Sequence, residues 1–235
     1  MSTSDPHPQT VKPSFRELYN VLLDDLGPQD WWPADGPFEM MVGAVLTQNT
    51  AWRNVEVSIA NLRNAGWLTP RALAESDQTT LLKLITPSGF MTAKAATLAR
   101  LSEWVLAHRD AEIAGWDDAT LRASLLAVKG VGPETADAIA MYVYDRALFI
   151  WDAYARRVMG HVWDQTIPPY ETAKRRFYDQ FVSSRFTVAE AQELHALVVR
   201  AGKRARTEGW DWLDVLPPSQ SSSCQRQDLY VRMTA

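Results

Sequence analysis

Two glycines that flank one apolar residue form the stretch of this sequence with the clearest chemical meaning. They are Gly130 and Gly132, with Val131 between them and Lys129 in front, inside a longer helical pattern over 125–139. Glycine permits backbone angles that other residues resist, and it lets a second backbone approach closely. The helix that follows begins with free N–H groups and a positive dipole end. Such a hairpin can hold a sugar–phosphate backbone without reading its sequence, although a tight turn between packed helices would leave the same pattern.

The elements that must position this hairpin are helices almost throughout. Apolar residues recur at three- and four-residue spacing, and Gly and Pro end the runs. Helices are expected over 15–26, 38–46, 51–64, from 69, 92–108, 120–128, 134–144, 152–162, 172–185 and 188–206. Only 147–151 is typical of a short extended segment. We therefore predict an all-α fold with about ten helices.

Length and composition limit the class of protein. The 235 residues suffice for one large domain or two small ones, and 46 % hydrophobic with 22 % charged residues is typical of a soluble chain. No apolar run has the roughly 20 residues of a membrane span, and the polar N-terminus lacks the apolar stretch of a secretory signal. Cys224 is the only cysteine, so an iron–sulfur cluster is excluded. We expect a cytoplasmic protein that has no metal site and no membrane partner.

Charge is divided unevenly along the chain. The net charge is −4, but residues 146–206 carry 11 Lys and Arg against 6 Asp and Glu. Residues 1–145 carry 11 against 18. A basic block beside an acidic half is a mild indication of a polyanion partner, although solvated helix faces would produce the same counts.

The hairpin resembles that of the helix-hairpin-helix DNA glycosylases related to endonuclease III. The match covers the whole pattern of 125–139, from the apolar residues before Lys129 to the Thr and Ala after the glycines. The resemblance implies that Gly130, Val131 and Gly132 bind the DNA backbone. Lys129 lies before the hairpin and is not the family's catalytic lysine, so we expect it to contact a phosphate. It also implies a monovalent cation at the hairpin carbonyls.

Other motifs of that family lie on both sides of the hairpin. The family places an essential aspartate at the start of the next helix, and Asp152 lies there, eighteen residues after Glu134. A carboxylate near the sugar C1′ can stabilise positive charge or accept a proton from water, although Asp152 also suits a helix N-cap. The resemblance implies that Gln48, within 47–50, fills the gap left by a flipped base. Phe90 is then a second wedge.

Two departures from the family pattern change the expected chemistry. Bifunctional members use a lysine two residues after the second hairpin glycine, and Glu134 stands there in this chain. A carboxylate cannot be that amine nucleophile. Many relatives also carry four cysteines after the closing helix, whereas Arg206 occupies the first of those positions here. We therefore expect a monofunctional enzyme without an iron–sulfur cluster.

A narrower resemblance concerns the tryptophans. Cluster-free relatives that excise 3-methyladenine share Trp-Trp-Pro ahead of the glutamine segment and an aromatic residue beyond it, here Trp31, Trp32, Pro33 and Trp52. A 3-methylated purine is cationic, and stacked indoles attract a flat cation by about 0.5–2 kcal/mol per contact. These four residues are therefore predicted to bind the substrate, although tryptophans also serve as core residues.

The resemblance spans about residues 15–206 and implies two helical lobes with a cleft between them. One lobe is expected to be a six-helix bundle over 37–146 that contains the hairpin. The second is expected to combine 10–36 with 147–216 and to carry Asp152. Residues 217–235 are expected to be a flexible tail.

The predicted function is that of a monofunctional DNA glycosylase of base excision repair, acting as a monomer on double-stranded DNA that contains a damaged base. It would flip out and release alkylated purines such as 3-methyladenine. Two alternatives stay open at this point. One is an endonuclease III-like glycosylase for oxidised pyrimidines or mismatched thymine. The other is a damage-binding protein without catalysis.

Overall fold

Residues 12–29 and 31–214 of this computed structural model are described, and they are helical without a strand. Fourteen α-helices and one 3-10 helix, η1, follow one another in this part of the chain. Their bounds are α1 Phe15–Leu26, α2 Pro37–Leu46, α3 Trp52–Asn64, α4 Pro70–Ala74, α5 Gln78–Ile85, η1 Thr86–Ser88, α6 Met91–Ala107, α7 Asp110–Ile113, α8 Asp118–Ala127, α9 Pro133–Tyr142, α10 Ala153–Val162, α11 Tyr170–Arg176, α12 Tyr178–Ser183, α13 Val188–Glu208 and α14 Asp211–Asp214. The all-α fold class is confirmed.

Several helices begin at residues that satisfy their first free N–H groups. Ser14 and Thr187 each form a capping box with the glutamate three residues later, at the starts of α1 and α13. Asp152 caps α10 through its side chain. Such caps stabilise a helix by about 0.5–2 kcal/mol each. The polar residues before the apolar runs therefore set where these helices start.

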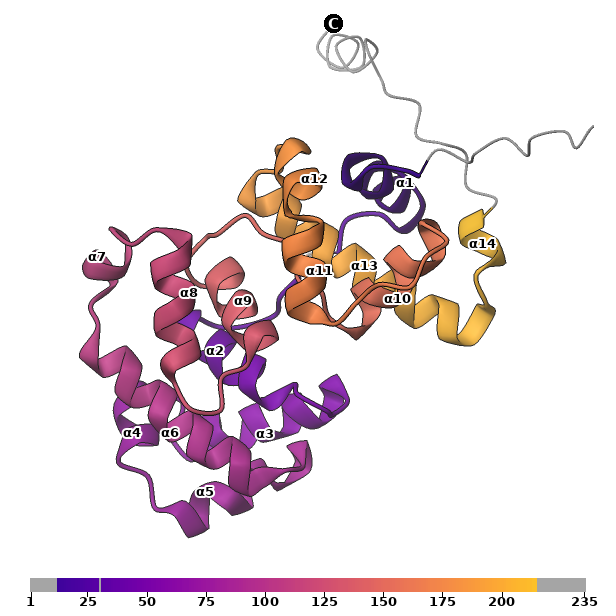
Figure 1. Cartoon of the computed structure of the whole chain (residues 1–235). Coiled ribbons are helices and arrows are strands. Elements are labelled where there is room, and N and C mark those ends of the chain that lie inside the picture. Colours follow the sequence, from indigo (N-terminus) through magenta and orange to yellow (C-terminus); the bar gives the residue numbers. More distant parts are fainter. Residues whose placement is uncertain (1–11, 30, 215–235) are drawn as a thin grey trace, which may run out of the picture.

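Helices α2 to α9 form one lobe, which we call the bundle lobe (Figure 1). Within it α2 packs on α3, α6 and α9, while α4 and α5 pack on α6. Helices α8 and α9 lie against each other as a hairpin, joined by a loop that contains Gly130 and Gly132. The bundle lobe thus presents this loop at one end of two packed helices.

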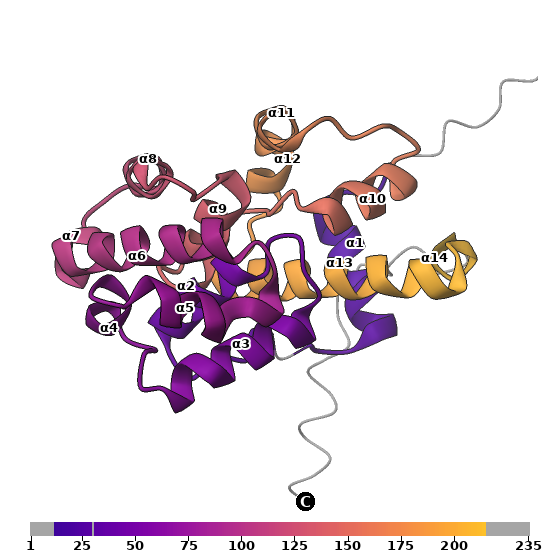
Figure 2. The ribbon, with the colours of Figure 1, turned by 90° about the horizontal axis from the view of Figure 1, so that it is seen from below.

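Helix α1 joins α10 to α14 in the second lobe, which we call the terminal lobe, so the two ends of the described chain meet there (Figure 1). Helix α13 packs on α1 and α10 and also reaches α9 of the bundle lobe (Figure 2). A Cβ at Gly202 of α13 would lie 2.7 Å from Cδ1 of Tyr154, so only glycine lets α10 approach this closely. Buried apolar residues of both lobes form one continuous core.

Some expectations differ from the structure or are not reached by it. Residues 147–151 form no strand. The helices α5, α7 and α14 were not expected, and 172–185 is divided into α11 and α12, so the number rises above ten. The expected boundaries at 37, 147 and 216 stay a prediction. The tail 217–235, with Cys224, lies outside the described residues. Among the described helices, none is both long and apolar enough to cross a bilayer.

Candidate active site

A cavity of about 370 Å³ lies where α2, α3, α9, α10 and α13 meet. Its lining includes five residues singled out from the sequence or its family resemblance: Trp31, Trp32, Gln48, Trp52 and Asp152. The remaining lining residues are Ala44, Thr47, Thr50, Ala51, Glu134, Ala138, Ile150, Tyr154, His195, Val199 and Lys203. We call this space the tryptophan cavity. It has the size and the mixed apolar and polar lining of a small-molecule site.

Asp152 is held at the N-terminus of α10 by the hydrogen bond with which it caps this helix. Its Oδ1 accepts a hydrogen bond from the backbone N–H of Ala155 at 2.6 Å. The second oxygen, Oδ2, lies 3.8 Å from Nε2 of His195, which is too long for a hydrogen bond. One carboxylate oxygen is therefore fixed by the helix, and the other is left for a group that enters the cavity.

His195 is placed by a buried tyrosine rather than by a metal. Its Nδ1 lies 2.6 Å from the hydroxyl of Tyr142, and both side chains are buried. Burial, reinforced by the charge of Asp152, raises the pKa of Tyr142 well above its ordinary value, so this phenol stays protonated. No group of three or more potential ligands that could hold a metal occurs in the part of the chain that the structure describes.

Glu134 is the second carboxylate of the cavity, and sequence reasoning assigned it no role. Its Oε1 accepts a hydrogen bond from Nε2 of Gln48 at 3.3 Å. Burial raises the pKa of Glu134, and the charge of Asp152 raises it further, against the lowering effect of Gln48. Its position at the start of α9 could have been read from the sequence, but its contact with Gln48, 86 residues away, could not.

The three tryptophans form one aromatic cluster. The ring centroids of Trp31 and Trp32 lie 5.8 Å and 5.3 Å from that of Trp52, and the Trp32 and Trp52 planes are nearly perpendicular. A Cβ at Gly43 would lie 3.3 Å from the Trp32 ring, so the glycine makes room for this indole. Pro33 is exposed and does not line the cavity, so the structure does not bring it to the predicted substrate site.

Two polar atoms in residues that line the cavity are buried without a hydrogen-bond partner among the described residues. They are Nε1 of Trp31 and Oγ1 of Thr47. Burying a polar group without a partner costs about 1–3 kcal/mol. Both atoms lie just behind the cavity surface, so a ligand would bond to either one only after a small movement of the lining. Neither the indole N–H nor the hydroxyl had a signal in the sequence beyond its residue type.

Lys203 also belongs to this site. It lies at the rim of the cavity with Nζ 5.5 Å from the centroid of the Trp31 ring, at cation–π distance. Partial burial lowers its pKa, as does Arg200, while Asp152 raises it. Asp152, Glu134 and Lys203 are thus the carboxylates and the amine of the cavity.

The hairpin loop lies outside the tryptophan cavity and has an unusual backbone. Gly130 has φ +104°, and a Cβ there would meet Oγ1 of Thr97 at 2.0 Å. Val131 is buried and donates its N–H to the carbonyl of Val128. Lys129 is exposed, and Gly132 precedes α9 with no side-chain cap on its first N–H groups. This arrangement leaves the N–H groups of α9 free for an anion.

Phe90 lies at a second exposed turn, between η1 and α6. Its side chain is 67 % exposed, and its φ of 47° is left-handed, which is rare for a bulky residue. It does not line the cavity. A phenylalanine so far out of the core is consistent with the predicted wedge, and that role stays a prediction.

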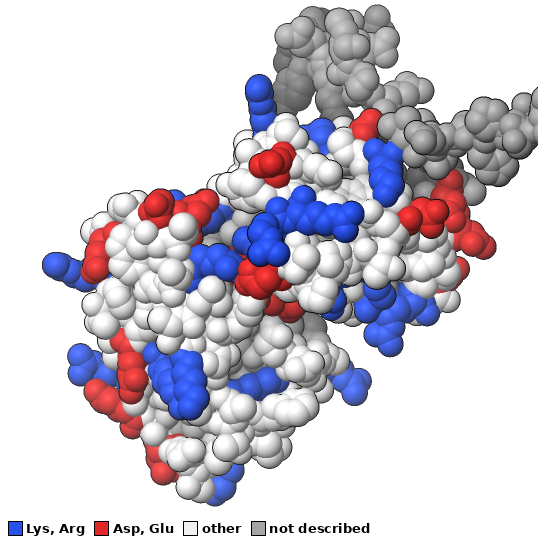
Figure 3. All heavy atoms as spheres, in the orientation of Figure 1, with Lys and Arg blue, Asp and Glu red and all other residues white. Residues whose placement is uncertain are grey.

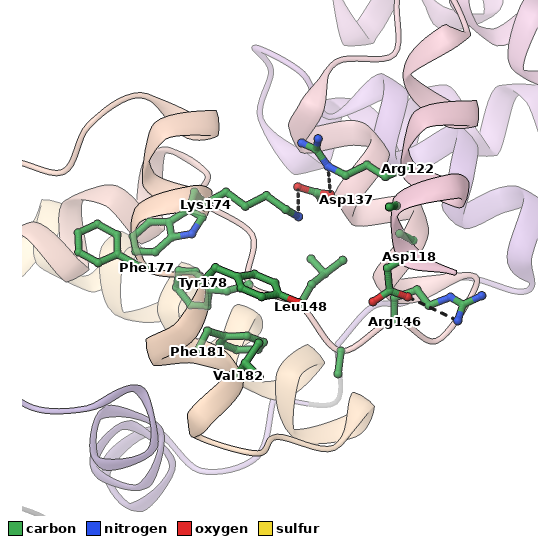
Figure 4. Close-up of a pocket in the computed structure, with 15 residues that line it drawn as sticks. Asp118, Arg122, Asp137, Arg146, Leu148, Lys174, Phe177, Tyr178, Phe181 and Val182 are labelled. Carbon is green, nitrogen blue, oxygen red and sulfur yellow. Dashed lines mark hydrogen bonds and ion pairs between the residues drawn. The ribbon is translucent and has the colours of Figure 1, made fainter. Parts of the chain in front are cut away.

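A second cavity of about 280 Å³ lies between α8, α9, α11 and α12 (Figure 4). Its buried carboxylate, Asp137, is paired with Arg122 and Lys174 at 2.8 Å each and accepts a hydrogen bond from the Tyr170 hydroxyl. None of the site residues predicted from the sequence lines it. We call it the junction cavity, because Lys174 and Tyr170 come from the terminal lobe and Asp137 from the bundle lobe.

Positive side chains reach across the place where the lobes meet. Figure 3 shows a group of Lys and Arg along the middle of the face it views, with acidic side chains directly beside it and further charges of both signs toward the edges. The net charge of the chain does not reveal this arrangement. For a polyanion that approaches the protein, the charges close to the contact surface matter more than the small net charge of the whole chain.

The family model of HhH-GPD superfamily base excision DNA repair proteins matches residues 42–181. A protein of Methanocaldococcus jannaschii described as a putative DNA repair glycosylase is 41 % identical over 150 residues, covering 62 % of this chain and 68 % of that protein. Endonuclease III of Sulfolobus acidocaldarius is 24 % identical over 168 residues, covering 71 % and 73 %.

Solved structures agree with these matches. H. pylori 3-methyladenine DNA glycosylase bound to 1,N6-ethenoadenine has a TM-score of 0.70 at 26 % identity, covering 82 % of this chain and 98 % of that one. An endonuclease III–DNA complex shares the fold with a TM-score of 0.60 at 16 % identity, covering 78 % and 82 %. The resemblance inferred from the hairpin is confirmed: this chain belongs to the HhH-GPD superfamily of base excision DNA repair proteins.

Proposed function

We propose that this protein is a monofunctional DNA glycosylase that flips an alkylated purine, such as 3-methyladenine, out of double-stranded DNA and releases it by hydrolysis. The observation that carries the proposal is the meeting of Trp31, Trp32 and Trp52 with Asp152 around one cavity. Three indoles offer a flat base its stacking partners, and the carboxylate offers the sugar its charge partner.

The reaction assigns a separate task to each part of the site. The hairpin at Gly130 and Gly132 binds the backbone, and Gln48 and Phe90 occupy the gap in the stack. The bond between C1′ and the base nitrogen breaks, and the base leaves with the electron pair. Asp152 stabilises the positive charge that develops on the sugar and accepts a proton from the water whose oxygen bonds to C1′.

Charge and aromatic surface both favour a cationic purine. Asp152 and Glu134 line the cavity against the single amine of Lys203, so the carboxylates outnumber the ammonium when both are ionised. Indole faces attract a planar cation. The H. pylori neighbour, with 1,N6-ethenoadenine bound, supports a purine that carries an added alkyl group as the ligand class. The unsatisfied Nε1 of Trp31 and Oγ1 of Thr47 are the polar groups that would bond to the edge of the base.

Hydrolysis rather than strand cleavage follows from Glu134. It occupies the position at which bifunctional members carry their lysine, and a carboxylate cannot form a Schiff base. Lys203 is the one amine among the residues that line the cavity, and it lies at the rim. Nicking by wild type that Lys203→Ala abolishes would show that this amine replaces the family lysine and would overturn the monofunctional assignment.

The test is base release from methylated duplex DNA by wild type and Asp152→Asn, with the released bases separated by chromatography. A parallel duplex carries an oxidised pyrimidine and is analysed for strand cleavage with and without alkali. The proposal predicts release of 3-methyladenine by wild type only, with nicks appearing only after alkali. Cleavage of the pyrimidine duplex alone would favour an endonuclease III-like specificity. Tight binding to abasic DNA by both proteins, without release from either duplex, would identify a damage-binding protein.

A further inference from the structure

The loops that carry Gln48 and Phe90 are joined beneath the surface by one buried lysine. Lys94, in the first turns of α6, is 5 % exposed. Its Nζ donates to the carbonyl of Leu46 at 2.7 Å and to the carbonyl of Ser88 at 2.7 Å. Leu46 ends α2, directly before the loop of Gln48, and Ser88 ends η1, directly before the loop of Phe90.

The backbone of both loops needs such an anchor. Asn49, beside Gln48, has φ 55°, and Phe90 has φ 47° directly after Gly89 at φ 67°. Left-handed backbone at residues other than glycine is uncommon, and it persists where the surroundings hold it in place. The hydroxyl of the fully buried Ser88 donates to the carbonyl of Ile85 at 2.7 Å, which fixes the turn just below the lysine.

Burying Lys94 costs free energy, because its charged ammonium group is removed from water. No carboxylate pairs with its ammonium among the residues that the structure describes, and burial lowers its pKa. An apolar side chain of similar length would avoid the cost of burying a charge. An apolar side chain could not, however, donate hydrogen bonds to two carbonyls on separate loops. One of these carbonyls, that of Leu46, lies at the C-terminal end of α2, where the helix dipole is negative.

We propose that Lys94 is a positioning residue that holds the two wedge loops at a fixed separation, so that Gln48 and Phe90 enter the duplex as one unit. This inference rests on the proposed wedge roles of those two residues. It goes beyond that function by assigning the coupling between the wedges to a side chain that touches neither DNA nor the damaged base.

The experiment separates wedge insertion from chemistry. Wild type, Lys94→Met and Lys94→Arg are mixed with a duplex that contains a tetrahydrofuran abasic analogue opposite 2-aminopurine, whose fluorescence reports its stacking. The reference is the double variant Gln48→Ala/Phe90→Ala. Trp104→Phe is the stability control, because it removes a partly buried hydrogen bond from Trp104 to Ser124 in the same lobe, away from both loops. All proteins are compared at a temperature at which each is folded.

We expect Lys94→Met to lose the fluorescence change as fully as the double variant, while its affinity for undamaged duplex stays near wild type. Lys94→Arg keeps two or more donors and should retain part of the signal. Release of 3-methyladenine from duplex should fall by about 10²-fold, since displacement of the positioning groups by about 1 Å has that effect. Release from single-stranded methylated DNA, where no gap needs filling, should stay near wild type.

The opposite result would be a Lys94→Met protein that behaves like Trp104→Phe at equal folded fraction, with full fluorescence change and unchanged release from duplex. The lysine would then contribute to stability alone. The fluorescence signal needs no catalysis, so it tests the inference even if wild type releases no alkylated base, a result that would contradict only the proposed function.

Discussion

Helix α9 presents two carboxylates, three residues apart, to two different cavities. Asp137 faces the junction cavity, where it pairs with Arg122 and Lys174 (Figure 4). It also accepts a hydrogen bond from the Tyr170 hydroxyl. Glu134 faces the tryptophan cavity, where its one hydrogen bond is the 3.3 Å contact from Gln48. Asp137 therefore connects the two lobes, whereas Glu134 lines the same cavity as a second acid, Asp152. The two cavities thus differ in how the α9 carboxylate is satisfied: Asp137 has two cationic partners, whereas Glu134 has one neutral hydrogen-bond partner.

The largest expected effect is the loss of the acid that faces the sugar. Asp152→Asn should lower the rate of base release by about 10²–10⁴-fold, because a neutral amide neither stabilises the developing charge nor accepts a proton. Asparagine caps a helix as well as aspartate does, so the melting temperature should stay near that of wild type. Single-turnover release from methylated duplex, with thermal unfolding of the same samples, measures both. Equal rates in the two proteins would remove Asp152 from the mechanism.

The matching change in the junction cavity should lower stability and leave base release nearly unchanged. Asp137→Asn leaves Arg122 and Lys174 without their buried partner and should lower the free energy of unfolding by about 3–5 kcal/mol. Base release by the folded fraction should stay within about threefold of wild type, as for sites that act independently. Chemical denaturation gives the first quantity. A stable Asp137→Asn protein with strongly reduced release would mean that the junction cavity takes part in the chemistry.

A smaller effect should follow from removing the buried Thr47 hydroxyl of the tryptophan cavity. Thr47→Val keeps the shape of the side chain and removes an unpartnered oxygen. If the base bonds to that oxygen, kcat/KM should fall by about tenfold, the value of one hydrogen bond, while stability rises slightly. Ser102→Ala is the control, since Ser102 is buried and bonded within α6. A Thr47→Val enzyme with unchanged kcat/KM would exclude this contact.

The smallest expected effect is a change in the pH dependence of stability. The pKa of Glu134 is raised above its ordinary value of 4.5, mainly by burial and next by Asp152. The folded protein therefore holds this proton more tightly than the unfolded chain, and stability is lost as pH rises from 4.5 through the raised pKa. Glu134→Gln has no carboxyl group to titrate at this position, so it should not lose this contribution to stability as pH rises. Melting temperatures across this range should show the variant gaining on wild type as pH rises, and parallel curves would contradict the raised pKa.

Much of the fold could be predicted from the sequence, because its signals are local. Apolar spacing located the long helices, and the Gly130 and Gly132 pattern located the hairpin. The sequence did not show that α7 and α14 would be helices, since four residues carry too little periodicity, and it also did not indicate α5. It also favoured a short extended segment over 147–151, which has no partner strand in the described structure.

The site was predictable where a motif names the residue, and not where distant segments meet. Gln48, Asp152 and the tryptophans were named from motifs, and they line one cavity. Lys203 was not among the predicted site residues, because a helix pattern does not show which neighbour a long side chain will reach. The contacts of Glu134 with Gln48 and of Lys94 with Leu46 join segments far apart in the chain. Such contacts depend on how the helices of the bundle lobe pack against one another.

The most direct test of the account is to observe which cavity binds the damaged base. Free 3-methyladenine is titrated into ¹⁵N-labelled protein while the indole N–H signals of the ten tryptophans are followed, with each signal assigned by a Trp→Phe variant. The account predicts that the signals of Trp31, Trp32 and Trp52 shift together, with Trp31 moving most because its N–H gains a partner. Trp151, in the junction cavity, should stay unchanged. A shift of Trp151 without the other three would contradict the account.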